Sequence, residues 1–135
     1  MTWSELKRHL RSLGFEEDST MSEYSPIVID AVNRAMDLVY DTAVKDYQSY
    51  FSAADDFDAE DRPTHVTAST EDDFDIELPD SVVHIVALMA AHWLWLDDDE
   101  RKAVMYWNEA DGLIAGIRDS AARARKVKFT GGLVW

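Results

Sequence analysis

Residues 82–96, VVHIVALMAAHWLWL, decide the fold of this chain because they form its most apolar stretch. Only His84 and His92 interrupt the apolar side chains. A helix that crosses a bilayer needs roughly 18 or more such residues, so this stretch is too short. Its apolar side chains occupy nearly the whole circumference of a helix, and such a helix must be covered on most sides. We therefore predict a buried helix that is covered by its own bundle and by a second subunit.

Two helices are predicted before this central helix. Thr2 and Glu5 have the spacing of a capping box and Gly14 is a stop signal, which indicates a short first helix. Pro26 follows a good N-cap residue and starts a long second helix, which should end at about Ser49. Apolar residues recur along the second helix at spacings of three and four, and they predict one buried stripe: Ile29, Val32, Met36, Val39, Ala43 and Tyr47.

The segment between Phe51 and Asp80 is strongly acidic, with eleven Asp and Glu residues against one basic residue. Mutual repulsion should keep it extended and solvated. Residues 65–68 and 74–78 alternate apolar and polar side chains, which predicts a small β-hairpin over about residues 64–78. A lone hairpin is marginally stable in water, so this one should lean on the helices or pair with a neighbouring subunit.

A fourth helix is predicted from about Asp99 to about Arg125. The carboxylates of residues 97–100 can cap its start and complement its dipole. Gly112 and Gly116 share one face, where they allow either a close helix contact or a slight bend. Apolar side chains alternate at spacings of four and three, as in a seam against another helix: Ala103, Trp107, Ala110, Ile114, Ile117 and Ala121.

Length and composition favour one mainly α-helical domain. The chain has 135 residues, of which 47% are hydrophobic, enough for one core but not for two. We expect a four-helix bundle-like domain over residues 1–125, with a small β-hairpin between helices 2 and 3, and an extended C-terminal arm over residues 126–135. The chain has no cysteine and its N-terminus lacks the apolar core of a signal peptide, which favours the cytoplasm.

Several classes of function find no support in the sequence. A net charge of −14 repels phosphate backbones and argues against ordinary DNA or RNA binding. No phosphate-binding loop, nucleophile elbow or His-Glu-x-x-His pattern is present. Residues 56–60 begin like a calcium loop, but Asp61 stands where glycine is needed and Thr67 where a bidentate glutamate is needed. We therefore predict no catalytic residue, no metal and no cofactor.

The last ten residues, KVKFTGGLVW, differ from the body in charge and composition. From Ser120 onward there are four basic residues and no acidic one. A short apolar segment beyond the last helix either folds back onto its own core or docks on a partner, for example as an added strand. We predict docking, with the terminal tryptophan as an anchor. The candidate docking residues are Lys126, Val127, Lys128, Phe129, Gly131, Gly132, Leu133, Val134 and Trp135.

A second set of candidate contacts is aromatic and apolar. Aromatic residues are frequent both in cores and at interface hot spots. A core position is favoured for Trp93 and Trp107, but both also belong to the set that we expect at a subunit interface. That set is Phe74, Ile76, Trp93, Trp95 and Trp107.

The order of these elements resembles the head-to-tail connector adaptors of tailed bacteriophages, small helical proteins that form a ring beneath the portal. The resemblance begins with a short helix, a long helix and an acidic segment that closes on residues 77–80, ELPD. An apolar helix, an acidic break at residues 97–100 and a long Trp-bearing helix follow. The tail KFTGGLVW, residues 128–135, is also similar to the ends of many such adaptors.

This resemblance implies a structural virion protein and not an enzyme. It implies a ring of about twelve copies, matched to the symmetry of the portal. The C-terminal arm would grip the portal protein, and a stopper, tail or nozzle protein would bind the opposite face. Double-stranded DNA would pass through the ring without sequence readout, and an acidic wall would let it slide during ejection. The implied location is the virion neck, and the host cytoplasm during assembly.

A different class of function is an acidic regulatory protein or DNA mimic that binds a basic partner. It accounts for the charge, but for neither the basic arm nor the apolar excess of residues 82–96. A small hydrolase with two carboxylates is a third class, for which the sequence shows no recognisable site. Removing the arm separates the classes, because only portal docking should be lost.

Overall fold

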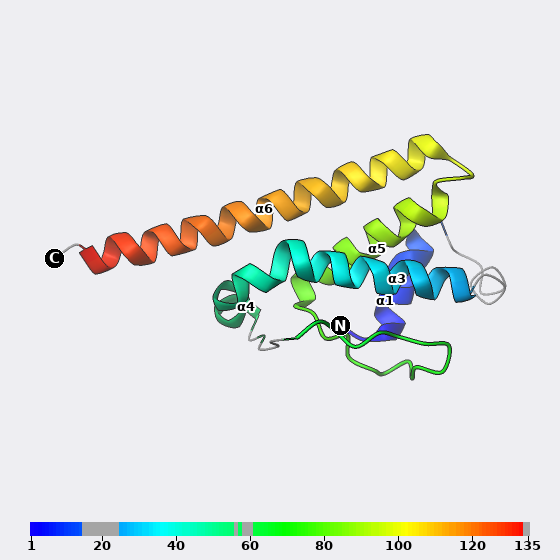
Figure 1. Cartoon of the computed structure of the whole chain (residues 1–135), viewed down its shortest axis with the longest axis horizontal. Helices are drawn as coiled ribbons and strands as arrows, with labels where there is room; N and C mark the ends of the chain where they lie inside the picture. The colour runs from blue at the N-terminus through cyan, green and yellow to red at the C-terminus, as the bar shows by residue number, and fades with distance from the viewer. Residues whose placement is uncertain (15–24, 56, 58–60, 134–135) are drawn as a thin grey trace.

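The computed structural model of the chain describes residues 1–14, 25–55, 57 and 61–133, and for residues 25 and 125–133 it describes the backbone alone. This part of the chain is mainly helical, as predicted (Figure 1). A π-helical turn, η1 (Tyr40–Val44), and a 3-10 turn, η2 (Lys45–Tyr47), join α3 to α4. The α-helices are α1 (Trp3–Ser12), α3 (Ser25–Val39), α4 (Gln48–Asp55), α5 (Asp80–Trp95) and α6 (Glu100–Leu133).

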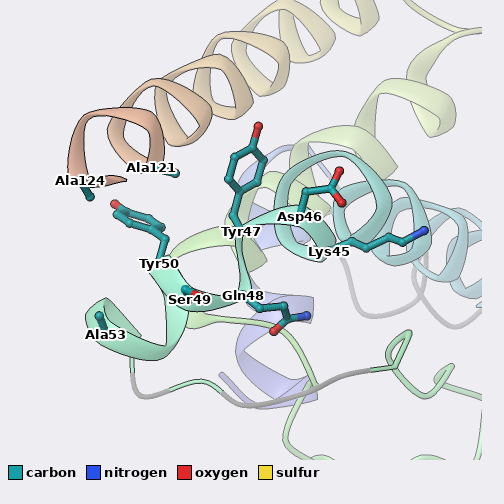
Figure 2. A pocket seen from close by; sticks show the side chains of 9 residues that line it. All are labelled: Lys45, Asp46, Tyr47, Gln48, Ser49, Tyr50, Ala53, Ala121 and Ala124. Carbon is teal, nitrogen blue, oxygen red and sulfur yellow. The ribbon is translucent and has the colours of Figure 1, made fainter. Parts of the chain in front are cut away.

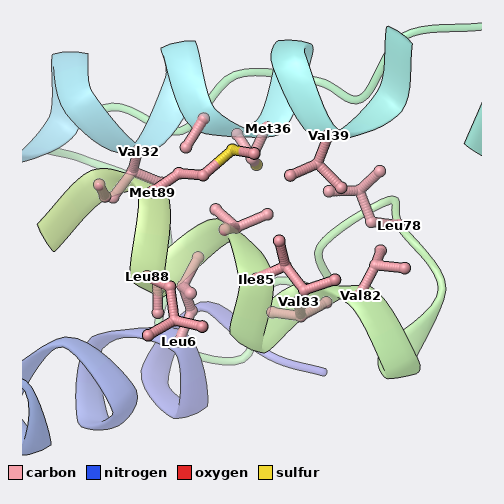
Figure 3. Close-up of a cluster of buried hydrophobic side chains, with 14 of the residues drawn as sticks. Leu6, Val32, Met36, Val39, Leu78, Val82, Val83, Ile85, Leu88 and Met89 are labelled. Carbon is pink, nitrogen blue, oxygen red and sulfur yellow. The ribbon is translucent and has the colours of Figure 1, made fainter. Parts of the chain in front are cut away.

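Helix α5 is the centre of the bundle, as its apolar sequence predicts. Helices α1, α3 and α6 all pack against it. Figure 3 shows Met36 and Val39 of α3 on one side of α5 and Leu6 of α1 on the other. The chain thus covers α5 with its own helices, so the predicted cover by a second subunit is not needed here. The buried residues of α5 are Val82, Val83, Ile85, Val86, Ala87, Leu88, Met89, Ala90 and Ala91.

Helix α1 begins and ends where the sequence predicts. Thr2 Oγ1 accepts a hydrogen bond from the Glu5 backbone N–H at 3.2 Å, and a Glu5 carboxylate oxygen accepts from the Thr2 N–H at 3.4 Å. Gly14 follows the helix with a φ of 115°, a conformation that favours glycine. The capping box and the glycine therefore set the length of α1.

The β-hairpin predicted over residues 64–78 is not formed in the described part of the chain, so that prediction is wrong. The second of its two runs pairs with the N-terminus. The Trp3 N–H donates to the Phe74 carbonyl at 2.8 Å, and the Ile76 N–H donates to the Met1 carbonyl at 2.9 Å. The backbone groups that the hairpin would have used are thus satisfied by a segment more than 70 residues away in sequence.

The first run is held by a side chain of α3. The Val66 N–H donates to Asn33 Oδ1, and Asn33 Nδ2 donates to the Val66 carbonyl, both at 2.9 Å. The amide of Asn33 thereby replaces a neighbouring strand. Val66 and Ile76 are both buried, so the alternation identified side chains that face inward but not the partners of the backbone.

The long helix predicted from Pro26 to about Ser49 is interrupted. Helix α3 ends at Val39, and the chain passes through η1 and η2 before α4 begins. Thr42 Oγ1 donates to the Leu38 carbonyl at 2.7 Å, a local bond of the kind that bends helices. Turns of the π type are frequent at functional sites.

Helix α6 begins as predicted and then extends further than predicted. Asp99 Oδ1 accepts from the Lys102 N–H at 3.1 Å and caps the first turn. At 1.5 Å per residue its 34 residues span about 51 Å, roughly twice the length of the 16-residue α5. Its C-terminal part therefore projects past the bundle (Figure 1). The buried residues of its predicted seam are Ala103, Ala110, Ile114 and Ala121.

The arm over residues 126–135 was expected to be extended, and over residues 126–133 this is wrong, because the backbone continues as α6. Each residue added to an existing helix gains a backbone hydrogen bond, which offsets the low propensity of Gly131 and Gly132. Residues 134–135 lie outside the described residues. Earlier in α6, a Cβ at Gly112 or Gly116 would have no neighbour within 4 Å, so neither glycine serves a close contact with the residues that the structure describes.

Candidate functional site

Histidine and acidic side chains do not gather into a metal centre in the described part of the chain. These residues contain no group of three or more His, Asp or Glu side chains that could hold a metal ion. His92 Nδ1 lies 2.7 Å from the Ala103 carbonyl, and His65 Nε2 lies 2.9 Å from Asp37 Oδ2. Most of the calcium-loop-like run of residues 56–60 lies outside the described residues. None of the described helices is long and apolar enough to span a bilayer.

His84 is a half-buried histidine on α5. Burial lowers its pKa from the ordinary value of 6.5, and the positive charge of nearby His9 lowers it further, while Glu109 acts in the opposite direction. Burial penalises the charged imidazolium, so the neutral ring is favoured in the fold. The surroundings of His84 on α5 therefore disfavour its charged form.

A groove of about 560 Å³ lies between the η2–α4 segment and the distal part of α6, residues 118–133 (Figure 2). Figure 2 shows the rings of Tyr47 and Tyr50 directed toward α6, where the small side chains of Ala121 and Ala124 leave room. We call this hollow the α4–α6 groove. Its lining residues are Lys45, Asp46, Tyr47, Gln48, Ser49, Tyr50, Ala53, Ala121 and Ala124.

The elements on the two sides of the α4–α6 groove are held by contacts of residues next to it. Arg118 of α6 donates from Nε and from Nη2 to the Thr42 carbonyl, at 3.1 and 2.9 Å. This carbonyl belongs to η1, so the arginine ties α6 to the interrupted helix. Phe51 is fully buried and its ring meets that of Tyr50 edge-on at 5.2 Å. The groove is therefore held open by packed elements on both sides.

A second hollow of about 400 Å³ shares Gln48, Ser49 and Ala53 with the groove and extends to Phe57. The two hollows are lined mainly by tyrosine, alanine, serine and glutamine side chains. Tyrosine and small apolar side chains suit the burial of another molecule's apolar side chains. The lining therefore suits the docking of another molecule's apolar side chains.

The α4–α6 groove lies where the charge of the chain changes sign. Residues 1–117 contain 26 acidic and eight basic residues, whereas residues 118–135 contain one acidic and five basic residues. Arg123, whose side chain is 77% exposed, pairs with Asp119 one helical turn earlier at 2.6 Å. A partner of the distal part of α6 would therefore meet a basic helix on an otherwise acidic protein.

The structure brings together two of the five residues expected at a subunit interface. The rings of Trp93 and Trp107 lie 6.3 Å apart, and that of His92 lies 4.9 Å from Trp107. The guanidinium of Arg34 lies 4.3 Å above Trp93. Both tryptophans are half-buried and pack against the core without belonging to its buried residues, and they form one aromatic cluster with a cation on its face.

The other three expected interface residues lie elsewhere. Trp95 Nε1 donates to the Leu13 carbonyl at 3.0 Å, and Lys102 Nζ lies 4.2 Å from the centre of its ring. Ile76 is buried in the chain's own core, and Phe74 is half-buried beside the N-terminus. The fold thus already uses Trp95 and Ile76 for internal packing.

The docking residues predicted in the arm follow one another along the end of α6 from residue 126 to Leu133, and Val134 and Trp135 lie outside the described residues. Sequence reasoning missed the α4–α6 groove. Tyr47 was assigned to a buried stripe, and Tyr50 was not singled out. A signal was present in the spacing, because two tyrosines three residues apart face two alanines three residues apart.

Comparisons of the chain with protein-family models, curated proteins and solved structures found no match. The function is therefore argued from the residues, the geometry above and the resemblance in element order.

Proposed function

We propose that this protein is a structural adaptor of a bacteriophage neck, which forms a ring between the portal and a tail, stopper or nozzle protein. The observation that carries the proposal is the distal part of α6. It leaves the bundle as a projecting basic helix on an acidic body (Figure 1). A connector needs surfaces of different charge, because one surface must bind a partner protein while another must not bind DNA.

The acidic body suits the wall of a DNA channel. DNA-binding proteins gain affinity from Lys and Arg contacts to phosphates. With 26 acidic residues against eight basic ones, residues 1–117 would repel the duplex and let it slide. A ring of about twelve copies around the channel follows from symmetry matching to the portal.

The projecting end of α6 is assigned to the portal. Because the backbone of residues 126–133 is helical, docking would place a helix in a groove of the portal instead of adding a strand to a sheet. The basic residues Lys126 and Lys128 would steer the encounter. The opposite face would receive the tail-side protein. This assignment locates the protein in the virion neck, and in the host cytoplasm before assembly.

Co-sedimentation with the portal from the same genome tests the proposal. The full chain should co-sediment stoichiometrically, and a chain truncated after Arg125 should not. Arg101→Ala, at the opposite end of α6, is the matched control and should bind like the full chain. Circular dichroism of the truncated chain checks that the bundle is intact. If neither the full nor the truncated chain binds the portal, the proposal fails and an acidic decoy for a basic protein becomes the leading function.

A further inference from the structure

The two ends of α6 lie next to surfaces that complement each other. At its start is the turn between α5 and α6, which we call the α5–α6 corner, residues 96–105. Near its other end is the α4–α6 groove. We propose that the α5–α6 corner of one copy seats in the α4–α6 groove of the next copy.

The α5–α6 corner exposes large apolar side chains. Leu96, Val104 and Met105 are 45%, 46% and 54% exposed. Ile27, 58% exposed, opens α3, which begins at the same end of the molecule (Figure 1). These four are the large hydrophobic residues that the described part of the chain leaves exposed. Apolar side chains gathered at one end mark an interaction surface, and methionine adapts well to a partner's shape.

The α5–α6 corner is also held in place. The Asp99 N–H donates to the Trp95 carbonyl at 2.8 Å, and the His92 ring contacts the Ala103 carbonyl at 2.7 Å. These bonds tie the last turn of α5 to the first turn of α6. Val104 and Met105 are therefore presented on a rigid support, and binding costs little conformational entropy.

The α4–α6 groove offers what these side chains lack. It provides about 560 Å³ lined by two tyrosine rings, three alanines, Gln48, Ser49 and the charged Lys45 and Asp46, and tyrosine is enriched at the cores of interfaces. A chain cannot fill its own groove with its own corner. Sixteen residues of helix separate Met105 from Ala121, about 24 Å at 1.5 Å per residue. A corner that fills the groove must therefore belong to another molecule.

Charge identifies that molecule as a second copy. The corner carries four consecutive exposed carboxylates, Asp97, Asp98, Asp99 and Glu100. Beside the groove, the distal part of α6 carries the exposed Arg123 and continues with Arg125, Lys126 and Lys128. Seating the corner in the groove therefore brings an acidic turn to a basic helix while apolar side chains enter the hollow.

Such a contact joins two different surfaces, so it propagates from copy to copy and closes into a ring when the rotation permits. It goes beyond the proposed function because it requires no portal. The same contact between copies could form if the protein had a function other than that of an adaptor.

Cysteine cross-linking tests the contact directly, because the natural chain contains no cysteine. Met105→Cys and Ala53→Cys are prepared as separate variants, mixed at high concentration and treated with a short bismaleimide. Covalent dimers should form in the mixture and exceed those formed by either variant alone. Ser69→Cys, in the exposed loop, replaces Met105→Cys in the control mixture. A yield no higher than in that control overturns the contact.

A charge exchange provides an independent test on the full chain. Asp97→Lys with Asp98→Lys should weaken self-association about tenfold in analytical ultracentrifugation, because like charges then meet. Mixing this variant with one that carries Arg123→Glu and Arg125→Glu should restore association. We expect these four substitutions to leave the fold intact. Circular dichroism of both variants checks this. Lack of restoration counts against the proposal. Portal co-sedimentation remains a separate result, so either proposal can fail alone.

Discussion

At Gly14 the end of α1 meets α5 and α6. The Leu13 carbonyl accepts from Trp95 Nε1 and from the Tyr106 hydroxyl, both at 3.0 Å. Gly14 has a φ of 115°, and a Cβ built there would lie 2.5 Å from Cζ2 of Trp95. The absent side chain thus permits both the turn and the approach of the indole ring. One residue thereby positions the first helix on the bundle.

Gly14→Ala is expected to destabilise the protein by about 1–3 kcal/mol, because the backbone is strained and the indole must move. Urea denaturation followed by tryptophan fluorescence measures the change. Gly112→Ala is the matched control, because its Cβ would meet nothing within 4 Å. In the interior of a helix it should stabilise by up to about 1 kcal/mol. Equal effects of the two substitutions would contradict this account.

Asn33→Ala should cost about 1–3 kcal/mol, because the buried Val66 backbone would lose both hydrogen bonds to the Asn33 amide. The free energy of unfolding in urea is the measurement. Asn108→Ala, on the exposed face of α6, is the control and should change stability little. If both variants lose the same stability, the amide does not serve as a partner for the backbone.

His84 should make the protein less stable as the pH falls below neutrality. Its pKa is lowered in the fold, so below the ordinary value of 6.5 the unfolded chain binds a proton that the folded chain does not. The contribution of His84 is therefore full above that pH and is lost toward the lowered folded pKa. Unfolding free energies between about pH 7 and pH 5 should fall less steeply in His84→Gln than in the unsubstituted protein. Identical slopes would contradict the assignment.

Arg118 acts at the scale of whole elements, since it ties the distal part of α6 to η1. Arg118→Ala should remove both bonds to the Thr42 carbonyl and speed amide hydrogen exchange in η1 and in the adjoining turns of α6. Exchange in α5 should stay unchanged. Arg123→Ala removes only an exposed pair with Asp119 and serves as the control. Unaltered exchange in Arg118→Ala would show that packing alone holds α6 to η1.

Elements with local signals were predictable from the sequence, and elements with distant partners were not. The capping box of α1 and the apolar circumference of α5 act within a few residues, so both were found. The predicted hairpin failed because the partners of Val66 and Ile76 are Asn33 and Met1, which no local pattern identifies. The α4–α6 groove was not predicted for the same reason, since it forms only where α4 and α6 come together in the fold.

At the scale of the molecule, charge is distributed along the fold instead of being mixed over the surface. The chain carries 27 acidic and 13 basic residues, and basic residues exceed acidic ones in α1, by three to one, and in residues 118–135, by five to one. Some acidic residues are locally compensated. The hydrogen bond from Lys7 to Asp72, at 2.6 Å, and the charge of Lys7 lower the pKa of the Asp72 carboxyl. Because the described residues bury no charged side chain, electrostatic energy here is a property of the solvated surface.

The excess of acidic charge should oppose folding at low ionic strength, because like charges come closer together in the compact state. Raising sodium chloride from about 20 to about 300 mM screens exposed charges and should raise Tm. The double variant Asp73→Asn/Asp75→Asn, in the exposed loop, should melt at a higher temperature in low salt and respond less to added salt. Thermal unfolding followed by circular dichroism measures both effects. A Tm that falls with salt would mean that attractive pairs such as Lys7 with Asp72 and Arg62 with Asp41 outweigh the repulsion.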